Sequence, residues 1–369
     1  MSQEKFTDIR SLLTAFAKAM NLINPEIENH HQQAAYLAYM LTRQMGMNEH
    51  DMQLSVYAAL LHDIGTVMLE QPVTIAQLEV QAKKISLSGA EMLSDISGMH
   101  EISEVIRYCQ YSWKEIISIP DGNLKFLQIA SAVHLADTVS TLLKPEIPVL
   151  QQRNEIVRLI TSLQETEFSS ETVKAFTEIS KVEFIWLDLL YHPSFLLVFT
   201  GKMGDISLDR TVELTKLLSR VIDYRSAFTA MHSAGVAASA VRLAQLAGMS
   251  EEECKMMRIA GNLHDIGKLK VPTEILEKPA KLTDDEFSII KEHSYFTRLI
   301  LLGVKGFEKI TDWASLHHEK LNGQGYPFRF GADRLDTGSR ILAIADIFSA
   351  ITEKRPYRDG MSKEQAVRV

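Results

Sequence analysis

Apolar residues recur every three or four positions along most of the chain, which is the spacing that one face of an α-helix produces. Residues 35–45 and 236–247 show this pattern most clearly. Gly46 and Gly248 follow these two segments, at positions where helices commonly end. We therefore expect a helix before each of these glycines.

Further helix starts are indicated by capping boxes, in which a Ser or Thr is followed three residues later by a Glu. Ser250 and Thr283 both stand in this arrangement. Strand-like alternation is scarce, and the Asn322-Gly323 pair lies between polar residues, so it indicates a functional loop rather than a hairpin. The whole pattern predicts an all-α protein.

A repeat divides this helical pattern into two related halves. The segment 46–65 recurs as the segment 248–267, and each copy ends in Leu-His-Asp-Ile-Gly. Another histidine lies 32 positions before the histidine of each copy, so that the offset of 202 is kept throughout. We expect two related helical bundles at residues 1–145 and 223–369, joined by a helical connector over 146–222.

Composition places the chain among globular proteins and narrows its partners. Its 369 residues suggest two or three domains, with 46% hydrophobic and 23% charged residues. Acidic residues number 47 against 39 basic ones, a net charge of −8 that argues against binding to duplex DNA or RNA. The polar start and the interrupted apolar stretch at 184–199 predict a cytoplasmic protein without membrane insertion. Cys109 and Cys254 are too few for a disulfide framework or a thiolate zinc site.

The second half concentrates residues that bind divalent metals. They fall in or beside helical segments and are His232, His264, Asp265, His293, His317, His318 and Asp346. A lone helical histidine is more often a core residue than a ligand, but the repeat and the adjacent pairs favour a metal site. Nitrogen and oxygen donors without thiolate favour two ions of iron or manganese over zinc, and disfavour magnesium.

Longer motifs connect these residues. The run His264-Asp265-Ile-Gly-Lys268 precedes His317-His318-Glu-Lys-Leu-Asn-Gly-Gln-Gly-Tyr326-Pro327, and Arg355-Pro-Tyr-Arg358 follows. Over about residues 223–369 the chain resembles the HD-GYP phosphodiesterases, a branch of the HD superfamily. The resemblance implies helical HD-type bundles and hydrolysis of a cyclic dinucleotide, either cyclic di-GMP or 3′3′-cyclic GMP-AMP (cGAMP).

The resemblance also implies a role for each residue. One metal would be held by His232, His264, Asp265 and Asp346, and the other by Asp265, His293, His317 and His318. Lys268, Tyr326, Arg355 and Arg358 would bind the substrate. Asp265 and Lys268 are the expected catalytic residues, because hydroxide formed between the metals attacks phosphorus while Lys268 neutralises charge on the equatorial oxygens. Lys268 as a helix-dipole partner, and Arg355 and Arg358 as surface charges, stay open.

Two features depart from the family pattern. Members with three metals carry a glutamate four residues before the first histidine, where this chain has Phe228, so two metals are expected. The chain also ends at Val369, soon after Arg358, whereas related domains usually continue with further helices. Two explanations stay open: a short variant of the domain, or a chain truncated at its C-terminus.

The first half keeps only part of the metal-binding pattern. Its matching residues are His30, His62, Asp63 and Asp137. Thr66 stands in place of Lys268, and the glycine-rich loop is missing. These four residues are equally compatible with one bound metal ion and with none. They are too few for a two-metal hydrolytic centre. We expect a regulatory or dimerising domain, with a homodimer as one possible assembly, and we expect His31 at the surface.

Two other functions stay open. A signalling scaffold would bind a cyclic dinucleotide without turnover, although seven metal ligands exceed what binding alone requires. A different HD-superfamily enzyme, such as a nucleotide phosphohydrolase or a di-iron oxygenase, would not need the Gly323–Pro327 loop or the arginines at 355–358. Cyclic di-GMP and cGAMP are equally compatible with the sequence, as are a linear product and mononucleotides.

Overall fold

A computed structural model of the chain describes residues 5–22, 29–68, 75–120, 123–191, 204–224, 232–353 and 360–366. These residues are mainly helical, and the strands among them form one two-stranded antiparallel sheet of β1 (Lys5–Asp8) and β2 (Asp205–Ser207). The prediction of an all-α protein is confirmed. Arg355, Arg358 and Phe228 lie outside the described residues.

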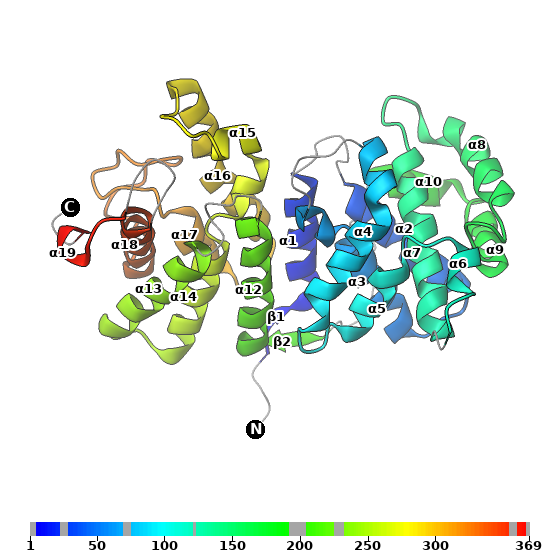
Figure 1. The fold of residues 1–369 in the computed structure, drawn as a ribbon, viewed down its shortest axis with the longest axis horizontal. Helices are drawn as coiled ribbons and strands as arrows, with labels where there is room; N and C mark the ends of the chain where they lie inside the picture. Colours follow the sequence, from blue (N-terminus) through cyan, green and yellow to red (C-terminus); the bar gives the residue numbers. More distant parts are fainter. Residues whose placement is uncertain are drawn as a thin grey trace. The chain divides into compact units, whose positions relative to one another are not determined.

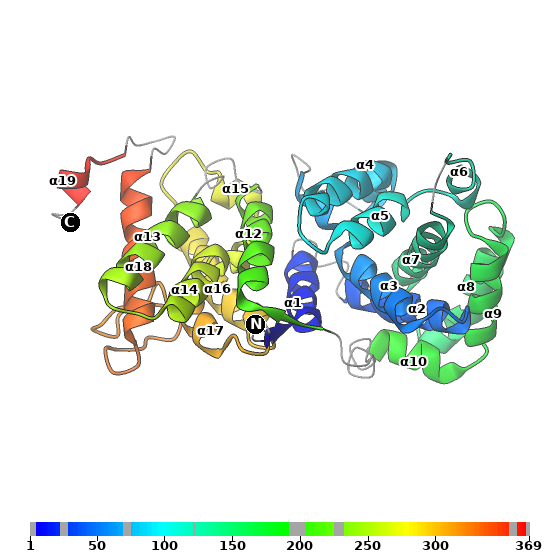
Figure 2. The same ribbon diagram turned by 90° about the horizontal axis from the view of Figure 1, so that it is seen from below.

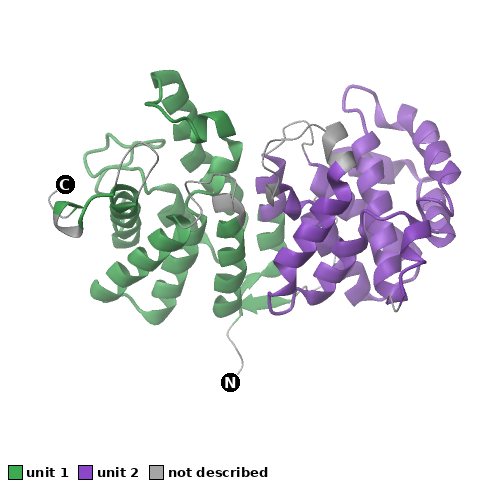
Figure 3. Cartoon of the chain, viewed as in Figure 1, with its two compact units in different colours: residues 1–15, 204–369 green, residues 16–203 purple. Residues whose placement is uncertain are grey.

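The chain forms two compact units, coloured separately in Figure 3, and the division falls within α1 (Ile9–Asn21). The unit of residues 16–203 contains α2 (His30–Gln44), α3 (Glu49–Leu61), η2 (Ile64–Met68), α4 (Ile75–Ser94), α5 (His100–Tyr108), α6 (Trp113–Ile116), α7 (Leu124–Leu142), α8 (Val149–Ser162), α9 (Ser170–Ile179) and α10 (Glu183–Tyr191). The unit of residues 1–15 and 204–369 contains the sheet, α12 (Leu208–Tyr224), α13 (His232–Leu246), α14 (Glu251–Leu263), η3 (Ile266–Lys270), α15 (Thr273–Leu276), α16 (Asp284–Leu301), α17 (Glu308–Ser315), α18 (Thr337–Thr352) and α19 (Lys363–Ala366).

The repeat seen in the sequence is a repeat of helices. In one unit α2 packs against α3 and α7, and in the other α13 packs against α14 and α18 (Figures 1 and 2). The short 3-10 helices η2 and η3 follow α3 and α14 and pack against α4 and α16. The expected pair of related helical bundles is confirmed.

Local sequence signals explain where these helices begin and end. Gly46 and Gly248 adopt φ values of +74° and +78°, a left-handed conformation that stops a helix at little cost for glycine. Ser250 and Thr283 accept hydrogen bonds from backbone N–H groups in the capping boxes that begin α14 and α16. These sequence predictions are confirmed.

Close packing of η3 against α16 depends on a glycine. A Cβ atom added to Gly267 would lie 1.9 Å from the backbone oxygen of His293. Gly65 stands in the same position against α4, where an added Cβ would lie 2.0 Å from the backbone oxygen of Ile85. Both bundles therefore need glycine after the His-Asp pair, because it lets the following helix approach that pair.

Residues 146–222 divide between the two units. Helices α9 and α10 pack against α2, and α8 packs against both of them, whereas α12 packs against α14. The functional division into 1–145, 146–222 and 223–369 stays a prediction. Among the residues described, none of the helices combines the length and the apolar character that crossing a bilayer requires.

The expectation that His31 lies at the surface is wrong. Residues 30–38 of α2 are all buried, so this part of the helix is covered on every side. A helix enclosed in this way has no solvent face, and a position next to a buried histidine is buried as well.

Candidate metal centre

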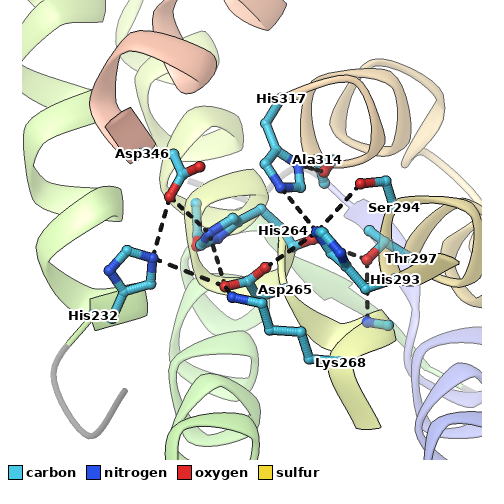
Figure 4. Close-up of polar contacts among 12 residues, drawn as sticks. His232, His264, Asp265, Lys268, His293, Ser294, Thr297, Ala314, His317 and Asp346 are labelled. Carbon is cyan, nitrogen blue, oxygen red and sulfur yellow. Dashed lines mark hydrogen bonds and ion pairs between the residues drawn. The ribbon is translucent and has the colours of Figure 1, made fainter. Parts of the chain in front are cut away.

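The seven predicted ligands come from five places in the unit of residues 1–15 and 204–369. His232 begins α13, His264 and Asp265 lie between α14 and η3, and His293 is on α16. The pair 317–318 follows α17, and Asp346 is on α18. All of them except the half-buried His318 are buried, and they fall into overlapping groups whose donor atoms converge (Figure 4). The structure therefore brings the predicted residues together, while their role as ligands stays a prediction.

The donor atoms form two groups with Asp265 between them. In the first group, the Asp346 Oδ1 atom lies 3.2 Å from Nε2 of His232 and 3.8 Å from Nε2 of His264. In the second group, the Nε2 atoms of His293 and His317 lie 3.3 Å apart, and His318 completes the group.

Asp265 offers one oxygen to each group. Its Oδ2 atom lies 3.3 Å from Nε2 of His264, and its Oδ1 atom lies 3.5 Å from Nε2 of His293 (Figure 4). A carboxylate that faces two clusters of imidazoles with different oxygens is suited to bridging two cations.

Hydrogen bonds turn the imidazoles so that Nε2 faces inward. The Nδ1 atoms of His264, His293 and His317 donate to the carbonyl oxygen three residues earlier in the chain, at 2.8, 2.6 and 2.7 Å. His232 donates instead to Oε2 of Glu353 at 3.0 Å. Metal-binding histidines commonly have such outward donation, because it fixes the tautomer that leaves the Nε2 lone pair free for the metal.

The residues fit divalent metal ions. Within the described part of the chain, the buried Nε2 of His264 and the buried Oδ1 of Asp265 make no hydrogen bond of good geometry. Leaving such atoms without a partner is costly, whereas a bound cation would satisfy them. Two nitrogens bound to one tetrahedral ion lie about 3.3 Å apart, which matches the spacing between His293 and His317.

The electrostatics keep most of this donor set ready for a metal. Burial lowers the pKa of His293 to about 4 and that of His318 to about 3, so that both imidazoles are neutral near pH 7. Burial alone would raise the pKa of Asp265, but His264 and Lys268 outweigh it and hold the pKa well below the ordinary value. Burial by itself would lower the pKa of His232, but hydrogen bonds to Asp346 and Glu353 outweigh burial and raise that pKa to about 9. Metal binding at His232 therefore displaces a proton.

The predicted substrate-binding residues lie beside these groups where the structure describes them. The Lys268 Nζ atom lies 2.5 Å from Oδ2 of Asp265, with about a quarter of the lysine side chain exposed. The ring centroids of Tyr326 and His318 are 4.8 Å apart, and the two rings make an interplanar angle of 30°. Phe287 meets the ring of Tyr326 edge-on, at a centroid separation of 6.0 Å. Tyr326 therefore forms a wall beside the second group of histidines.

Comparisons with known proteins agree with this arrangement. Residues 216–369 and residues 27–142 each match a family model described as an HD domain. The chain is 31% identical to 3′3′-cGAMP-specific phosphodiesterase 1 of Vibrio cholerae, over 98% of this chain and 87% of that protein. The chain belongs to the HD-GYP phosphodiesterase family. HD domains are metal-dependent, which fits the His and Asp clusters of this family member.

Other relatives match a smaller part of the chain, or its fold. The cyclic di-GMP phosphodiesterase PA4108 of Pseudomonas aeruginosa is 37% identical over 38% of this chain and 34% of that protein. A crystal structure of a cyclic GMP-AMP specific phosphodiesterase of V. cholerae (V-cGAP3) aligns with a TM-score of 0.68 and 18% identity. That alignment covers 98% of this chain and 92% of the other, and shows that the two share a fold.

Sequence reasoning missed a residue that shapes the glycine-rich loop of this HD-GYP domain. The Glu319 side chain is buried, and its carboxylate accepts hydrogen bonds from the backbone N–H groups of Phe328, Arg329 and Phe330 at 2.7, 3.1 and 3.0 Å. A Cβ added to Gly325 would lie 2.4 Å from the Cα of Glu319, so the loop folds tightly over that residue. The position of Glu319 directly after the histidine pair was the available signal.

Two further supporting residues gave no sequence signal. Glu353, at the end of α18, holds His232 as described above. Thr297 on α16 donates from Oγ1 to the carbonyl oxygen of His264 at 2.9 Å and accepts from the N–H of Gly267 at 3.1 Å. It therefore ties the His-Asp turn to the helix that carries His293 (Figure 4).

Proposed function

We propose that this chain hydrolyses a cyclic dinucleotide to a linear dinucleotide, with cGAMP as its preferred substrate, at the centre built around Asp265. The observation that carries the proposal is the position of Asp265, whose two carboxylate oxygens face separate groups of histidines. Binding alone would not require this arrangement, whereas an in-line displacement at phosphorus uses two cations.

The residues of the chain have distinct tasks in this reaction. Two divalent ions held by the two groups of His and Asp side chains would supply Lewis acidity for the attacking water. Asp265 keeps the two groups of histidines in register and is ionised at neutral pH. Lys268 places a cation beside that centre, where negative charge grows on the phosphoryl oxygens in the transition state. Tyr326 offers a flat apolar surface against which a base or ribose packs.

The preference for cGAMP rests on the relative that spans almost the whole chain. That protein is named as specific for 3′3′-cGAMP, whereas the matches named for cyclic di-GMP cover less than half of this chain. Iron or manganese is the proposed metal because the donor set has imidazoles and carboxylates but no thiolate. A regulatory or dimerising role of the first half, a homodimer and a cytoplasmic location stay predictions.

Anaerobically purified full chain tests the proposal by turnover of cGAMP and cyclic di-GMP with iron or manganese present. We expect linear product from both substrates and a higher kcat/KM for cGAMP. Asp265→Ala should lose this activity and bind about two fewer metal ions per chain than the wild type. Asp285→Ala, an exposed acidic position on α16, is the matched control and should change neither quantity. Binding of both dinucleotides without product from either would instead establish a scaffold.

A further inference from the structure

One arginine side chain lies where three segments of the C-terminal bundle meet. Arg298 is on α16, and its Nη1 atom donates to Oδ1 of Asp312 at 2.7 Å and to Oγ of Ser315 at 3.3 Å. Both of these acceptors are on α17. The Cζ atom of Arg298 lies 5.5 Å from the ring centroid of Phe328, in the loop that carries Tyr326. A side chain of α16 therefore contacts both α17 and this loop.

Each of these segments carries or leads into part of the proposed centre. His293 is on α16, one turn before the arginine. Helix α17 ends at Ser315, and the pair 317–318 follows directly after it. In the loop, Tyr326 stands shortly before Phe328. A group that joins α16, α17 and the loop therefore fixes the second group of histidines and the Tyr326 wall relative to each other.

The loop depends on contacts from outside for its shape. Arg329 has a φ value of +57°, a left-handed conformation that side-chain-bearing residues adopt only at a cost. The rings of Phe328 and Phe330, on either side of it in the sequence, stack at a centroid separation of 5.4 Å and an angle of 26°. The Cζ atom of Arg334 lies 4.9 Å from the ring of Phe330. Arg298 adds a contact from α16 to this aromatic pair.

The contact of Arg298 matters more for position than for stability. A guanidinium within about 6 Å of a ring centroid is attracted to the face of the ring, and the hydrogen bond to Asp312 holds the guanidinium in place. The side chains of Arg298 and Asp312 are 31% and 51% exposed, and an ion pair so close to water contributes little to folding. Its main consequence is the place at which Phe328 is held.

The other bundle differs at this position. The matched glycine contacts of the two 3-10 helices pair Ile85 with His293, an offset of 208. At the same offset Ala90, which is buried, stands in place of Arg298. That bundle also lacks the glycine-rich loop. The arginine therefore occurs in the bundle where it has a loop to hold.

We propose that Arg298 is a positioning residue for the proposed hydrolysis, because it holds Phe328 and thereby keeps the Tyr326 wall at its distance from the second group of histidines. Arg298 acts through the loop and does not touch the reacting phosphate. The kinetic consequence of this proposal rests on the proposed function, whereas the effect on the loop does not.

Arg298→Ala should weaken substrate binding and leave the chemical step intact. Tyr326 packs against a base or ribose, which is the same in the ground state and in the transition state, so displacement of the wall raises KM at constant kcat. A lost cation–π contact corresponds to about a 3- to 30-fold change in an equilibrium constant. We therefore expect KM for cGAMP to rise by about that factor, with kcat within about twofold and with the wild-type number of metal ions.

A small substrate separates the loop from the Asp265 centre. Methyl 4-nitrophenyl phosphate is a phosphodiester with neither base nor ribose, so the position of the wall should not affect it. Arg298→Ala should hydrolyse it with the wild-type kcat/KM. Arg258→Ala, which removes an exposed arginine of α14, is the matched control and should behave as the wild type with both substrates. Equal losses with both substrates in Arg298→Ala would overturn the proposal, since the arginine would then act on the centre itself.

Two further variants test the contact with the ring. Arg298→Lys keeps the charge but not the planar guanidinium that lies against an aromatic face, and Phe328→Leu removes the ring. We expect each to raise KM for cGAMP as Arg298→Ala does. The double variant Arg298→Ala/Phe328→Leu should raise it no further, because both changes remove the same contact. A lysine variant with the wild-type KM, or additive losses in the double variant, would refute a role through Phe328.

Hydrogen exchange tests the loop without any turnover. In Arg298→Ala the amides of residues 328–330 should exchange about 3- to 30-fold faster, while those of α16 keep their wild-type rates and show that the fold is intact. The two failures are thus distinguishable. A wild type that hydrolyses neither cyclic dinucleotide would contradict the proposed function, whereas unchanged exchange at residues 328–330 in Arg298→Ala would contradict this inference.

Discussion

Glu319 lies next to a predicted metal ligand, but its carboxylate faces the loop that carries Tyr326. Its Oε1 atom accepts from the N–H groups of Phe328 and Arg329, and its Oε2 atom accepts from that of Phe330. A glutamine can keep the first oxygen as an acceptor but presents an amide N–H₂ to Phe330. Glu319→Gln therefore removes one charged hydrogen bond and sets two donors against each other.

The magnitude follows from the bonds that are lost. A hydrogen bond to a charged group contributes about 1.5–3 kcal/mol, and a lost bond at a partly exposed loop falls at the lower end because water reaches the freed N–H. We expect Glu319→Gln to destabilise the ordered loop by about 1.5–2 kcal/mol. Since about 1.4 kcal/mol corresponds to a factor of ten, kcat/KM should fall roughly 10- to 30-fold if the substrate must restore the order of the loop.

Three measurements together test this reasoning. Hydrogen exchange should accelerate at the amides of residues 328–330, kcat/KM should fall, and the number of bound metal ions should stay at the wild-type value. Glu292→Gln, which makes the same change at an exposed position of α16, should behave as the wild type. If Glu319→Gln kept both the amide protection and kcat/KM within twofold, the carboxylate would not be organising the loop.

The remaining predictions concern Lys268, Glu353 and pH. Lys268→Ala should bind the wild-type number of metal ions while kcat falls about 100-fold, as measured by steady-state kinetics, because the lost charge acts in the transition state; a raised KM at constant kcat would instead indicate uniform binding. Glu353→Gln should keep the hydrogen bond to His232 but weaken metal binding about 10-fold in a chelator competition, with Glu353→Ala weaker still; equal affinities would exclude Glu353 as a positioning residue. The metal-free protein should be most stable near pH 6.5 in urea titrations. His293 and His318, whose pKa values are lowered to about 4 and about 3, oppose folding as pH falls below 6.5, and His232, whose pKa is raised to about 9, contributes less as pH rises above 6.5. Each group changes the stability by about 1.4 kcal/mol per pH unit within its range, so a stability that rises steadily from pH 5 to pH 9 would contradict these assignments.

The sequence was sufficient to predict the helical fold and to single out seven residues that the structure brings together, because these depend on local periodicity and on a fixed spacing. The offset of 202 holds from His30 to Gly65, where two helices and a turn are conserved in length. Beyond that point the offset changes, to 208 between Ile85 and His293 and to 209 between Asp137 and Asp346, and the equivalence of Ile85 with His293 became visible only in three dimensions. Insertions between helices remove the register on which a sequence comparison depends.

Other features could not be predicted because they depend on tertiary contacts. His31 is buried because α2 is enclosed by its neighbours, and helix periodicity cannot indicate that. Glu353 reaches His232 across 121 positions, and no local pattern connects a residue at the end of one helix with the first residue of another. Ligands are recognisable by residue type, whereas the groups that orient them are ordinary residues placed by the fold.

The two bundles show how little separates one group of donors from two groups on the same scaffold. His62 and His264 have the same outward hydrogen bond to a carbonyl three residues earlier, and Gly65 and Gly267 allow the same close approach of the next helix. The first group of donors therefore persists wherever this turn is kept. The second group needs three side chains from α16 and the segment after α17, and the proposed hydrolysis would use in addition Lys268 and the ordered loop. In the first bundle, which lacks the second group, the carboxylate of Asp63 lies instead between His62 and His31. Buried donors of this kind destabilise the fold unless a proton or a cation satisfies them, so the retained group sets a requirement of its own on the first bundle.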